Sequence, residues 1–321
     1  MTFSTAAWFA VVLALGQASG DAGPLDSLTL ELQAESQDVL PGEPVLMTLR
    51  WRNPGAHPVP VQKTAFFNPD RGAYKLLISA EESGPATEYL TDFVLKYLSP
   101  NAHSGIGGPP DTTFGAERTI TLQDLIFPAG EGYPFTRSGT YYIRYKYVQG
   151  KPSGEGTDRV TSGAPVKLVV REPALDGEKV FSKVMLDPAR GYLKCGIIAA
   201  SVAPKDFARV SKMTRDDIRG ELNQLITETA GTAGAQYFRY LLARTYDGSV
   251  EELGAACGVY EKILGEKAFP LTPHCYLELA DCYFRRGESK RHDDVLQAAS
   301  GLFATNPAVH MTRRPGWARH R

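Results

Sequence analysis

The chain has 321 residues, a hydrophobic content of 43% and a formal net charge of −1. About 300 residues follow its first apolar segment, a length that suggests two domains. The charge by itself names no partner. No later apolar run is long enough to cross a bilayer, so we expect no integral membrane segment.

The first 20 residues have the pattern of a secretory signal peptide. Ala6 to Gly16 is an apolar run of 11 residues, too short to span a membrane, and Ala18-Ser19-Gly20 offers the small residues of a cleavage site. The usual Lys or Arg ahead of the run is missing, and no cysteine follows the cleavage point to carry a lipid. We therefore expect an exported protein, periplasmic or secreted.

From residue 27 to 172 the apolar residues recur with a period of two, which is typical of strands. Leu28, Leu30 and Leu32 alternate with polar residues in the first strand. Further candidate strands are Val45–Arg52, Tyr74–Ile78, Glu88–Leu95, Arg118–Leu122, Tyr141–Val148 and Val166–Val170. Short strands separated by Gly and Pro turns favour an antiparallel sandwich.

One of these strands suggests which sandwich it is. Gly139-Thr140-Tyr141-Tyr142-Ile143 resembles the sixth strand of an immunoglobulin-like domain. The resemblance makes Tyr141 the corner tyrosine and places Ile143 where a cysteine often stands. This half contains no cysteine, so an apolar core must replace the inter-sheet disulfide. A jelly roll is the alternative fold.

One long loop interrupts this region, and a linker is expected after it. Ser99 to Glu117 is a long loop with several Gly and Pro, but it lacks the Gly-Lys-Ser/Thr of a phosphate-binding loop. Such a loop is either a binding loop or disordered, and we favour disorder. Residues 173–189 are expected to be a linker.

Residues 190–307 have the 3.6-residue period of helices. The pattern Leu-Ala-x-x-Tyr occurs twice, 37 residues apart, at Leu242-Ala243-Tyr246 and Leu279-Ala280-Tyr283. Self-similarity at this period is typical of stacked helix pairs that bury their apolar faces against their neighbours.

Capping signals delimit the helices of this half. Thr272 is expected to cap the first helix of the second copy, and Gly287 to end it with a left-handed turn. Thr214 with Asp217 predicts a capping box upstream, before an apolar stripe. Tyr192 to Val202 is apolar enough to be the partner of that upstream helix.

The second copy resembles a tetratricopeptide repeat. The matching residues are Tyr276, Leu279, Ala280, Tyr283, Gly287, Leu296, Ala299 and Pro307. His292 and Arg239 depart from the repeat pattern, and an unrelated helical bundle is the alternative. About three repeats are needed for a stable core, so we expect the upstream helices to complete a short solenoid.

This resemblance also implies a binding surface, because tetratricopeptide grooves are lined by one stripe of each first helix. The residues on that stripe are Tyr237, Tyr240, Arg244, His274, Glu278, Asp281 and Arg285. We predict that they bind a protein partner, since aromatic and Arg side chains are frequent hot spots. The alternative is that they are ordinary exposed helix residues.

The cysteines Cys195, Cys257, Cys275 and Cys282 all lie in the helical half. Cys275 and Cys282 are two turns apart on one helix, too far to be bridged. Antiparallel neighbouring helices would place Cys257 level with Cys282, so these two are the candidate disulfide. Reduced, buried cysteines are the alternative.

We find no sequence pattern for a metal, a cofactor or a catalytic site. Cys-x-x-Cys, His-Glu-x-x-His, a nucleophile elbow and a dinucleotide fingerprint are all missing from the sequence. The tail, residues 308–321, carries four Arg and no acid, and we expect it to be disordered. Its alternative role is attachment to an anionic surface, and the sequence does not support nucleic-acid binding.

The sequence thus predicts a multidomain protein, all-β and then all-α: an immunoglobulin-like antiparallel sandwich followed by a short tetratricopeptide-like solenoid. We expect a non-catalytic interaction or scaffold protein of the bacterial cell envelope. The alternative is a carbohydrate- or surface-binding protein in which the β half holds the ligand and the helices support it.

Overall fold

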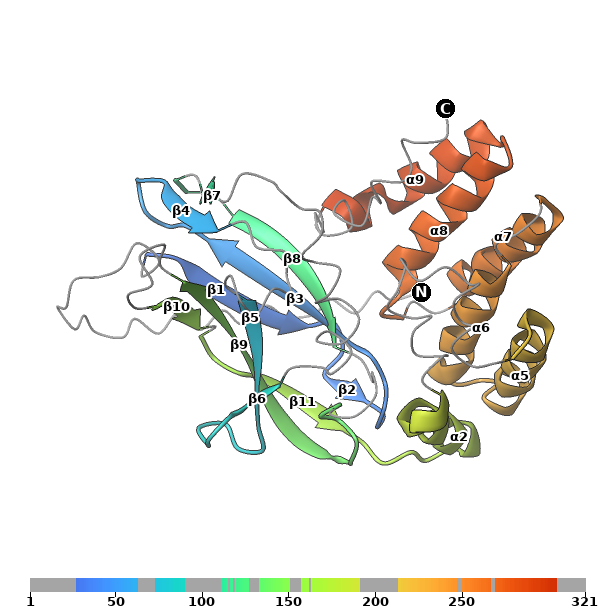
Figure 1. The fold of residues 1–321 in the computed structure, drawn as a ribbon, viewed down its shortest axis with the longest axis horizontal. Coiled ribbons are helices and arrows are strands. Elements are labelled where there is room, and N and C mark those ends of the chain that lie inside the picture. Colours follow the sequence, from blue (N-terminus) through green and yellow to red (C-terminus); the bar gives the residue numbers. More distant parts are fainter. Residues whose placement is uncertain are drawn as a thin grey trace, which may run out of the picture.

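The structure is a computed structural model that describes residues 27–62, 73–89, 111–114, 116–117, 119–126, 133–150, 157–161, 163–190, 213–246, 250–266 and 269–304. Strands occupy the first part of this range, and six α-helices occupy the second (Figure 1). The protein therefore combines a β part with a helical part, in the order expected from the sequence.

Most strands of the β part belong to two sheets. The strands are β1 (Thr29–Ala34), β2 (Asp38–Val39), β3 (Val45–Arg52), β5 (Ala73–Ser79), β6 (Thr87–Tyr89), β8 (Thr119–Ile126), β9 (Gly139–Gly150), β10 (Thr157–Thr161) and β11 (Val166–Val170). The smaller sheet has the order β1-β3-β8, and the larger has the order β2-β11-β9-β5-β6, with β10 also paired to β9. The described pairings are antiparallel, except that β2 runs parallel to β11.

A single apolar core joins the two sheets. Leu30 of β1, Met47 of β3 and Ile143 of β9 are all buried in it. In β11 the burial alternates along the strand, with Leu168 buried and Val169 exposed. The period-two pattern in the sequence is confirmed here, because side chains of a strand point alternately to the core and to water.

Tyr141 fastens the start of β9. Its hydroxyl donates a hydrogen bond to the carbonyl of Arg137 at 2.9 Å, and its ring packs edge-on against Phe135 with centroids 5.3 Å apart. A corner tyrosine makes the same bond back to the preceding backbone.

The long loop is ordered in part. Asp111–Phe114 forms β7, which pairs antiparallel with β4 (Val59–Gln62). This corrects the expectation of disorder for that part of Ser99–Glu117, because the ladder with β4 satisfies its backbone hydrogen bonds. Residues 99–110 lie outside the described residues.

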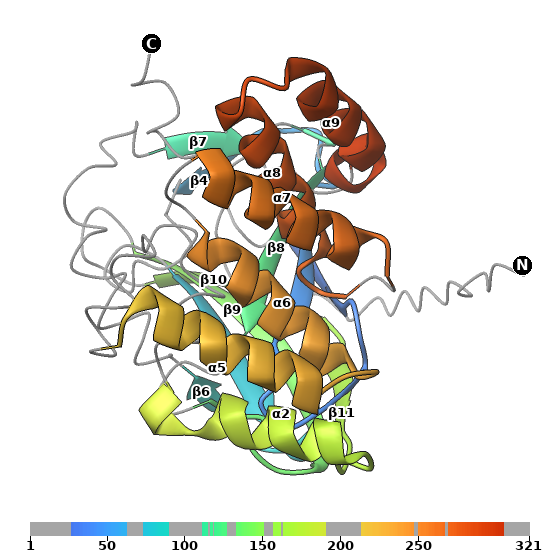
Figure 2. The same cartoon turned by 90° about the vertical axis from the view of Figure 1, so that its right-hand side faces the viewer.

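The helices are stacked in chain order, as Figure 2 shows from α2 to α9. They are α2 (Asp176–Leu186), α5 (Arg215–Glu228), α6 (Ala233–Thr245), α7 (Val250–Leu264), α8 (Thr272–Arg285) and α9 (Ser289–Ala304). From α5 onward each helix packs against the next, and α2 packs against both α5 and α6.

Helix α2 occupies the segment 173–189 that we expected to be a linker. Phe181 and Met185 of this helix are fully buried, so the segment belongs to the core of the helical part. Gly234 of α6 packs so closely against it that an added Cβ would lie 2.9 Å from the Phe181 side chain. The linker expectation is therefore corrected.

The local signals of the helical half mostly hold. The Thr214 hydroxyl accepts from the Asp217 N–H at 3.1 Å, and the Asp217 carboxylate accepts from the Thr214 N–H at 3.0 Å, which confirms the capping box. Gly287 ends α8 with a φ of +76° as predicted. Thr272 differs, because it is the first residue of α8 and its hydroxyl accepts from the Phe269 N–H instead of capping the helix.

Repeated residues take equivalent places in the stack. Leu242 and Ala243 of α6 are buried, and so are Leu279 and Ala280 of α8. A small apolar cluster lies between α8 and α9, in which Tyr276 and Leu277 of α8 and Leu296 of α9 pack around the buried Ala299.

Several predicted segments lie outside the described residues: the leader (1–20), the helix expected at Tyr192–Val202 and the tail (308–321). Within the described ranges, no helix combines the length and the hydropathy that a membrane span requires.

Two glycines test how tightly α2 is packed. Gly234→Ala should destabilise the protein by about 1–3 kcal/mol, because the new methyl group overlaps Phe181. Gly220→Ala in α5 is the matched control, since nothing lies within 4 Å of its added Cβ. It should be neutral or stabilise by up to about 1 kcal/mol, because alanine favours a helix.

Urea unfolding of the two variants and the wild type measures these free energies. Equal effects of the two substitutions would contradict the close contact between α2 and α6.

Candidate functional site

The predicted groove residues of α6 are buried. Tyr237, Tyr240 and Arg244 are 0%, 1% and 6% exposed, so the structure corrects the expectation that they lie on a binding surface. The Tyr237 ring stacks on Phe181 of α2 at 5.4 Å and meets Phe269, before α8, edge-on at 5.2 Å. Segments distant in the sequence therefore cover this stripe of α6.

Tyr240 and Arg244 instead belong to a polar cluster between helices. The Tyr240 ring lies 6.1 Å from the ring of Tyr260 on α7, and its hydroxyl interacts with Arg244. Glu278 of α8 is close enough to act on the charge of Arg244. Because a buried guanidinium must be matched by charge and hydrogen bonds, this cluster fixes α6 against α7 and α8.

The predicted residues of α8 are more accessible. Asp281 and Arg285 form an ion pair at 3.8 Å, with side chains 23% and 38% exposed, and Glu278 is half-buried. Phe284 lies between them in sequence and is 60% exposed. We call Glu278, Asp281, Phe284 and Arg285 the α8 face. The backbone of His274 lies in α8, but its side chain is outside what the structure describes.

The two cysteines proposed as a disulfide are brought together, but as free thiols. Cys257 and Cys282 are unbonded and buried, and their side chains share a hydrogen bond. Cys275 is also a buried free thiol, and Cys195 lies outside the described residues.

A cluster of charged residues that we did not predict lies where the β part meets the helices. It is the β–α junction, formed by Asp38, Leu40, Gly42, Glu43, Arg171, Glu178 and Tyr237. Arg171, just after β11, donates two hydrogen bonds to Glu178 of α2 at 2.9 and 2.5 Å. Its own N–H donates to the carbonyl of Val39 at 2.9 Å.

Glu178 is held by more than this pair. Its carboxylate also accepts from the N–H groups of Ala174 and Leu175, at 2.9 and 3.2 Å. Arg171 first, and then these two amides, lower the pKa of Glu178 to about 2. The residue is therefore a carboxylate at any ordinary pH, and it fixes the start of α2 to the end of β11.

Glu43 lies on the other side of the junction. Its carboxylate accepts from the Leu40 N–H at 2.9 Å and faces the hydroxyl of Tyr237, without a well-aligned hydrogen bond between them. Burial raises the pKa of Glu43 to about 7, against the opposing effects of Leu40 and Arg171. The loop that carries it lies directly on α2, since an added Cβ at Gly42 would be 2.9 Å from Met185.

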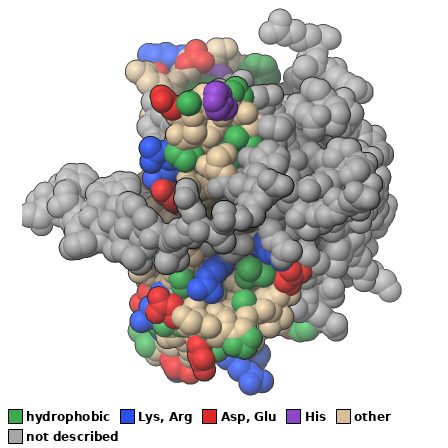
Figure 3. Space-filling view, turned by 90° about the vertical axis from the view of Figure 1, so that its left-hand side faces the viewer, with side chains coloured by type: hydrophobic (Ala, Val, Ile, Leu, Met, Phe, Trp, Pro, Cys, Tyr) green, Lys and Arg blue, Asp and Glu red, His purple; other side chains and the backbone are tan. Residues whose placement is uncertain are grey.

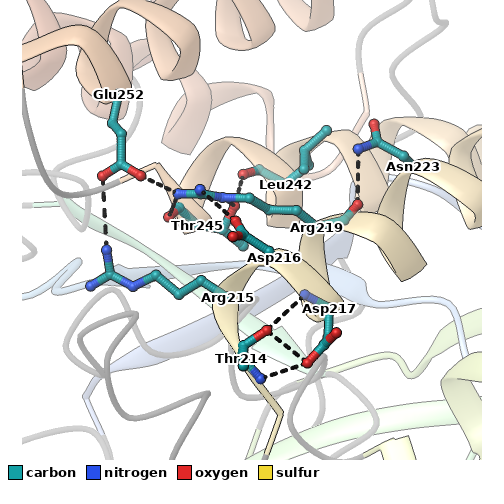
Figure 4. Close-up of polar contacts among 9 residues, drawn as sticks. All are labelled: Thr214, Arg215, Asp216, Asp217, Arg219, Asn223, Leu242, Thr245 and Glu252. Carbon is teal, nitrogen blue, oxygen red and sulfur yellow. Dashed lines mark hydrogen bonds and ion pairs between the residues drawn. The ribbon is translucent and has the colours of Figure 1, made fainter.

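A second charged cluster joins three helices, and Figure 4 shows it. Arg219 of α5 donates to the carbonyl of Thr245 at 2.8 Å, which is the end of α6, and to Glu252 of α7 at 2.6 Å. Its guanidinium lies 4.4 Å from the ring centroid of Tyr246. Arg215 reaches the same carboxylate of Glu252 from farther away, at 3.8 Å.

These clusters are suited to holding elements together. In the part of the chain that the structure describes, no group of three or more His, Cys, Asp or Glu could hold a metal ion. Sequence reasoning missed the junction because its members come from four separate segments, around residues 38–43, 171, 178 and 237, and follow no period. The only local signal was Pro41-Gly42, which marks the turn that carries Glu43.

Comparison with known proteins identifies no family. No protein-family model matches the chain, and no curated protein matches it. Solved structures with partial likeness include a β-glucosidase from Erythrobacter marinus, with 12% identity, 44% of this chain and 15% of that chain covered, and a TM-score of 0.23.

Two other structures give similar values. For the sporulation control protein Spo0M of Bacillus subtilis, identity is 9%, coverage is 50% of this chain and 54% of that one, and the TM-score is 0.25. For native alpha-2-macroglobulin from Escherichia coli, identity is 9%, coverage is 85% of this chain and 54% of that one, and the TM-score is 0.24. The chain thus covers less than two thirds of each of these structures, and likeness at this level carries no argument about fold or function.

The junction predicts a pH dependence of stability. The pKa of Glu43 is about 7 in the folded protein and 4.5 as a free side chain. The folded state therefore binds the extra proton, and stability should fall by about 3 kcal/mol as pH rises from 4.5 to 7. Glu178 acts in the opposite direction, because its stabilisation is present above pH 4.5 and is lost as pH falls towards 2.

Glu43→Gln should remove the fall between pH 4.5 and 7, since the amide is uncharged and can still accept from Leu40. Denaturant unfolding at a series of pH values measures this. Glu172→Gln changes an exposed carboxylate nearby and should keep the wild-type profile. A Glu43→Gln profile that still falls like that of the wild type would show that Glu43 is not the group responsible.

The three-helix cluster predicts unequal roles for two arginines. Arg219→Ala should cost about 1.5–3 kcal/mol, because it leaves the Thr245 carbonyl and the Glu252 carboxylate without their charged donor. Arg215→Ala should change stability by no more than about 0.5 kcal/mol, because its ion pair is long and exposed to water. Thermal and urea unfolding of both variants decides this, and equal costs would contradict the geometry.

Proposed function

We propose that this protein is an exported, non-catalytic interaction or scaffold protein of the bacterial cell envelope, and that it binds a protein partner through the α8 face. One observation carries the proposal. Among the predicted groove residues with described side chains, those of α8 retain exposed surface, whereas those of α6 are buried. The α8 face combines an exposed aromatic ring with both signs of charge, and Phe284 is its most exposed member.

The proposal includes a tetratricopeptide-like arrangement of the helices. It is supported by the equivalent burial of the repeated residues Leu242, Ala243, Leu279 and Ala280. It is also supported by the contacts of α6 with α7, of α7 with α8 and of α8 with α9, because each repeat of a solenoid packs on the next.

For the β part we propose an immunoglobulin-like sandwich. Such sandwiches place the second and fifth strands in one sheet and the third, sixth and seventh in the other. The pairing of β3 with β8, and of β5 and β11 with β9, fits that division. The hydrogen bond from Tyr141 to Arg137 supports it as well.

Charge alone does not select the partner. Figure 3 shows acidic, basic and hydrophobic side chains interspersed on the described surface of the β side, in line with the net charge of −1. A partner is therefore expected to be recognised by shape and by local pairs, of which Asp281 and Arg285 are the example on α8.

The test is affinity capture from envelope extract with the whole mature chain as bait. The charges of the α8 face are exchanged by Asp281→Arg with Arg285→Asp. This should lower the amount of captured partner at least about tenfold, the effect expected when charge pairs are buried in an interface. The matched control exchanges the exposed pair Asp176 and Lys179 of α2, which should leave capture unchanged.

The proposed surface would be contradicted if the α8 variant still captured the partner and the α2 variant did not. Retention of the chain on cell-wall glycan, with no protein captured, would instead favour the carbohydrate-binding alternative.

A further inference from the structure

Two thiols meet inside the helical stack. Cys257 of α7 and Cys282 of α8 are 2% and 5% exposed, and the two side chains are in hydrogen-bond contact. They are 25 residues apart in sequence and stand on adjacent helices. Both side chains belong to the same buried cluster, and α7 packs directly on α8, so the two cysteines are neighbours across this helix interface.

A guanidinium lies beside one of the two thiols. Arg286, at the end of α8, hydrogen-bonds to Cys257 and pairs with Glu288 at 2.9 Å. To reach Cys257 it crosses Gly254, one turn earlier on α7, where an added Cβ would lie 3.6 Å from its Nη1 atom. The Arg286 side chain is itself 28% exposed.

The two thiols are not equivalent. The hydrogen bond from Cys282 and the Arg286 guanidinium favour the thiolate of Cys257 and lower its pKa to about 7, although burial opposes them. The interaction with Cys257 and burial raise the pKa of Cys282. Because the thiolate is the nucleophile in disulfide exchange, Cys257 is the thiol suited to react first and Cys282 the one suited to follow.

We propose that Cys257 and Cys282 form a reversible disulfide that joins α7 to α8, with Cys257 as the attacking thiol and Arg286 as its positioning residue. The oxidant is a disulfide RS–SR, either a small molecule or a protein. The Cys257 thiolate attacks one sulfur, the RS–SR bond breaks, and one RS⁻ leaves and takes up a proton.

The second step closes the bond. Cys282 loses its proton and attacks the Cys257 sulfur of the mixed disulfide, which releases the second RS⁻. The two cysteines have then lost two electrons and two protons, and the oxidant has become two thiols. The bond ties the first helix pair to the second, and disulfides of this kind persist in the oxidising compartments to which exported proteins go.

Cys275 supplies the internal comparison. It lies on α8 with Cys282, it is fully buried, and burial raises the pKa of its thiol. We expect it to stay reduced under conditions in which the pair is oxidised.

The experiment uses the whole chain, fully reduced and then incubated at pH 7 in graded mixtures of reduced and oxidised glutathione. Free thiols are alkylated, and the mass and the linked peptides are measured. Trypsin leaves Cys275 and Cys282 on one peptide, because no Lys or Arg separates them. A second cleavage after Glu278 therefore distinguishes the two.

The expected result is a chain lighter by two hydrogens, with Cys257 linked to Cys282. The oxidised form should melt about 5–10 °C above the reduced form, because the bond restricts the unfolded chain. Cys275→Ser should leave the linkage intact, and Cys257→Ser or Cys282→Ser should abolish it. Linkage to Cys275 or Cys195, or thiols at 257 and 282 that stay reduced in the most oxidising mixture, would overturn the proposal.

A kinetic measurement tests Arg286. Arg286→Ala should slow the reaction with oxidised glutathione about three- to tenfold at pH 7, because a smaller fraction of Cys257 is thiolate. The difference should shrink at pH 9, where the thiolate forms without help. A purely structural role of Arg286 would instead give the same change at both pH values. Since the wild-type mapping needs no substitution, the proposal stays testable even if a cysteine variant fails to fold.

Discussion

The ion pair between Arg171 and Glu178 is the contact on which the arrangement of the two parts depends. Glu178 stands in the first turn of α2, where it satisfies the amides of Ala174 and Leu175 while it accepts two hydrogen bonds from Arg171. Its side chain is only 9% exposed, so its charge must be matched inside the protein. Removing Arg171, whose own side chain is 39% exposed, would leave the Glu178 carboxylate buried without its charged partner, which costs more than the pair itself contributes.

The remaining helices are placed through α2. Phe181 contacts the rings of Tyr237 and Phe238 of α6, and the other helices follow in order from there. Leu40 of the β part belongs to the helical core, and Leu186 of α2 packs on the core of the sheets. The two parts therefore share apolar surface as well as charge, which indicates a fixed relation between them across the described residues.

Patterns that depend on nearby residues could be predicted from the sequence. The alternation in β11, the capping box at Thr214 and the left-handed turn at Gly287 each involve residues a few positions apart, and the structure confirms all three. Helix α2 was missed because Leu175, the residue before its first turn, is a poor capping residue. The start of α2 is instead stabilised by Glu178, which accepts hydrogen bonds from the amides just before the helix and from Arg171, a residue outside the helix.

The binding stripe of α6 could not be predicted for a related reason. Neighbouring positions of a helix differ by about 100° in direction, so the core face and the groove face are adjacent stripes. Which one is covered depends on segments far away in sequence, here Phe181 and Phe269 against Tyr237. By contrast, the proximity of Cys257 to Cys282 followed from the antiparallel order of two neighbouring helices, which the sequence does contain.

The small apolar cluster around Ala299 has a consequence for the motions of the stack. Tyr276, Leu277 and Leu296 pack there, and among the described residues of α9 only the partly buried Val295 packs on the main helical core, so we expect α9 to open more easily than the helices inside that core. Local opening of this kind needs less free energy than global unfolding and exposes backbone amides to exchange with solvent deuterium. Amide protection should therefore decrease along the stack, from α6 in the middle of the main core to α9 at its end.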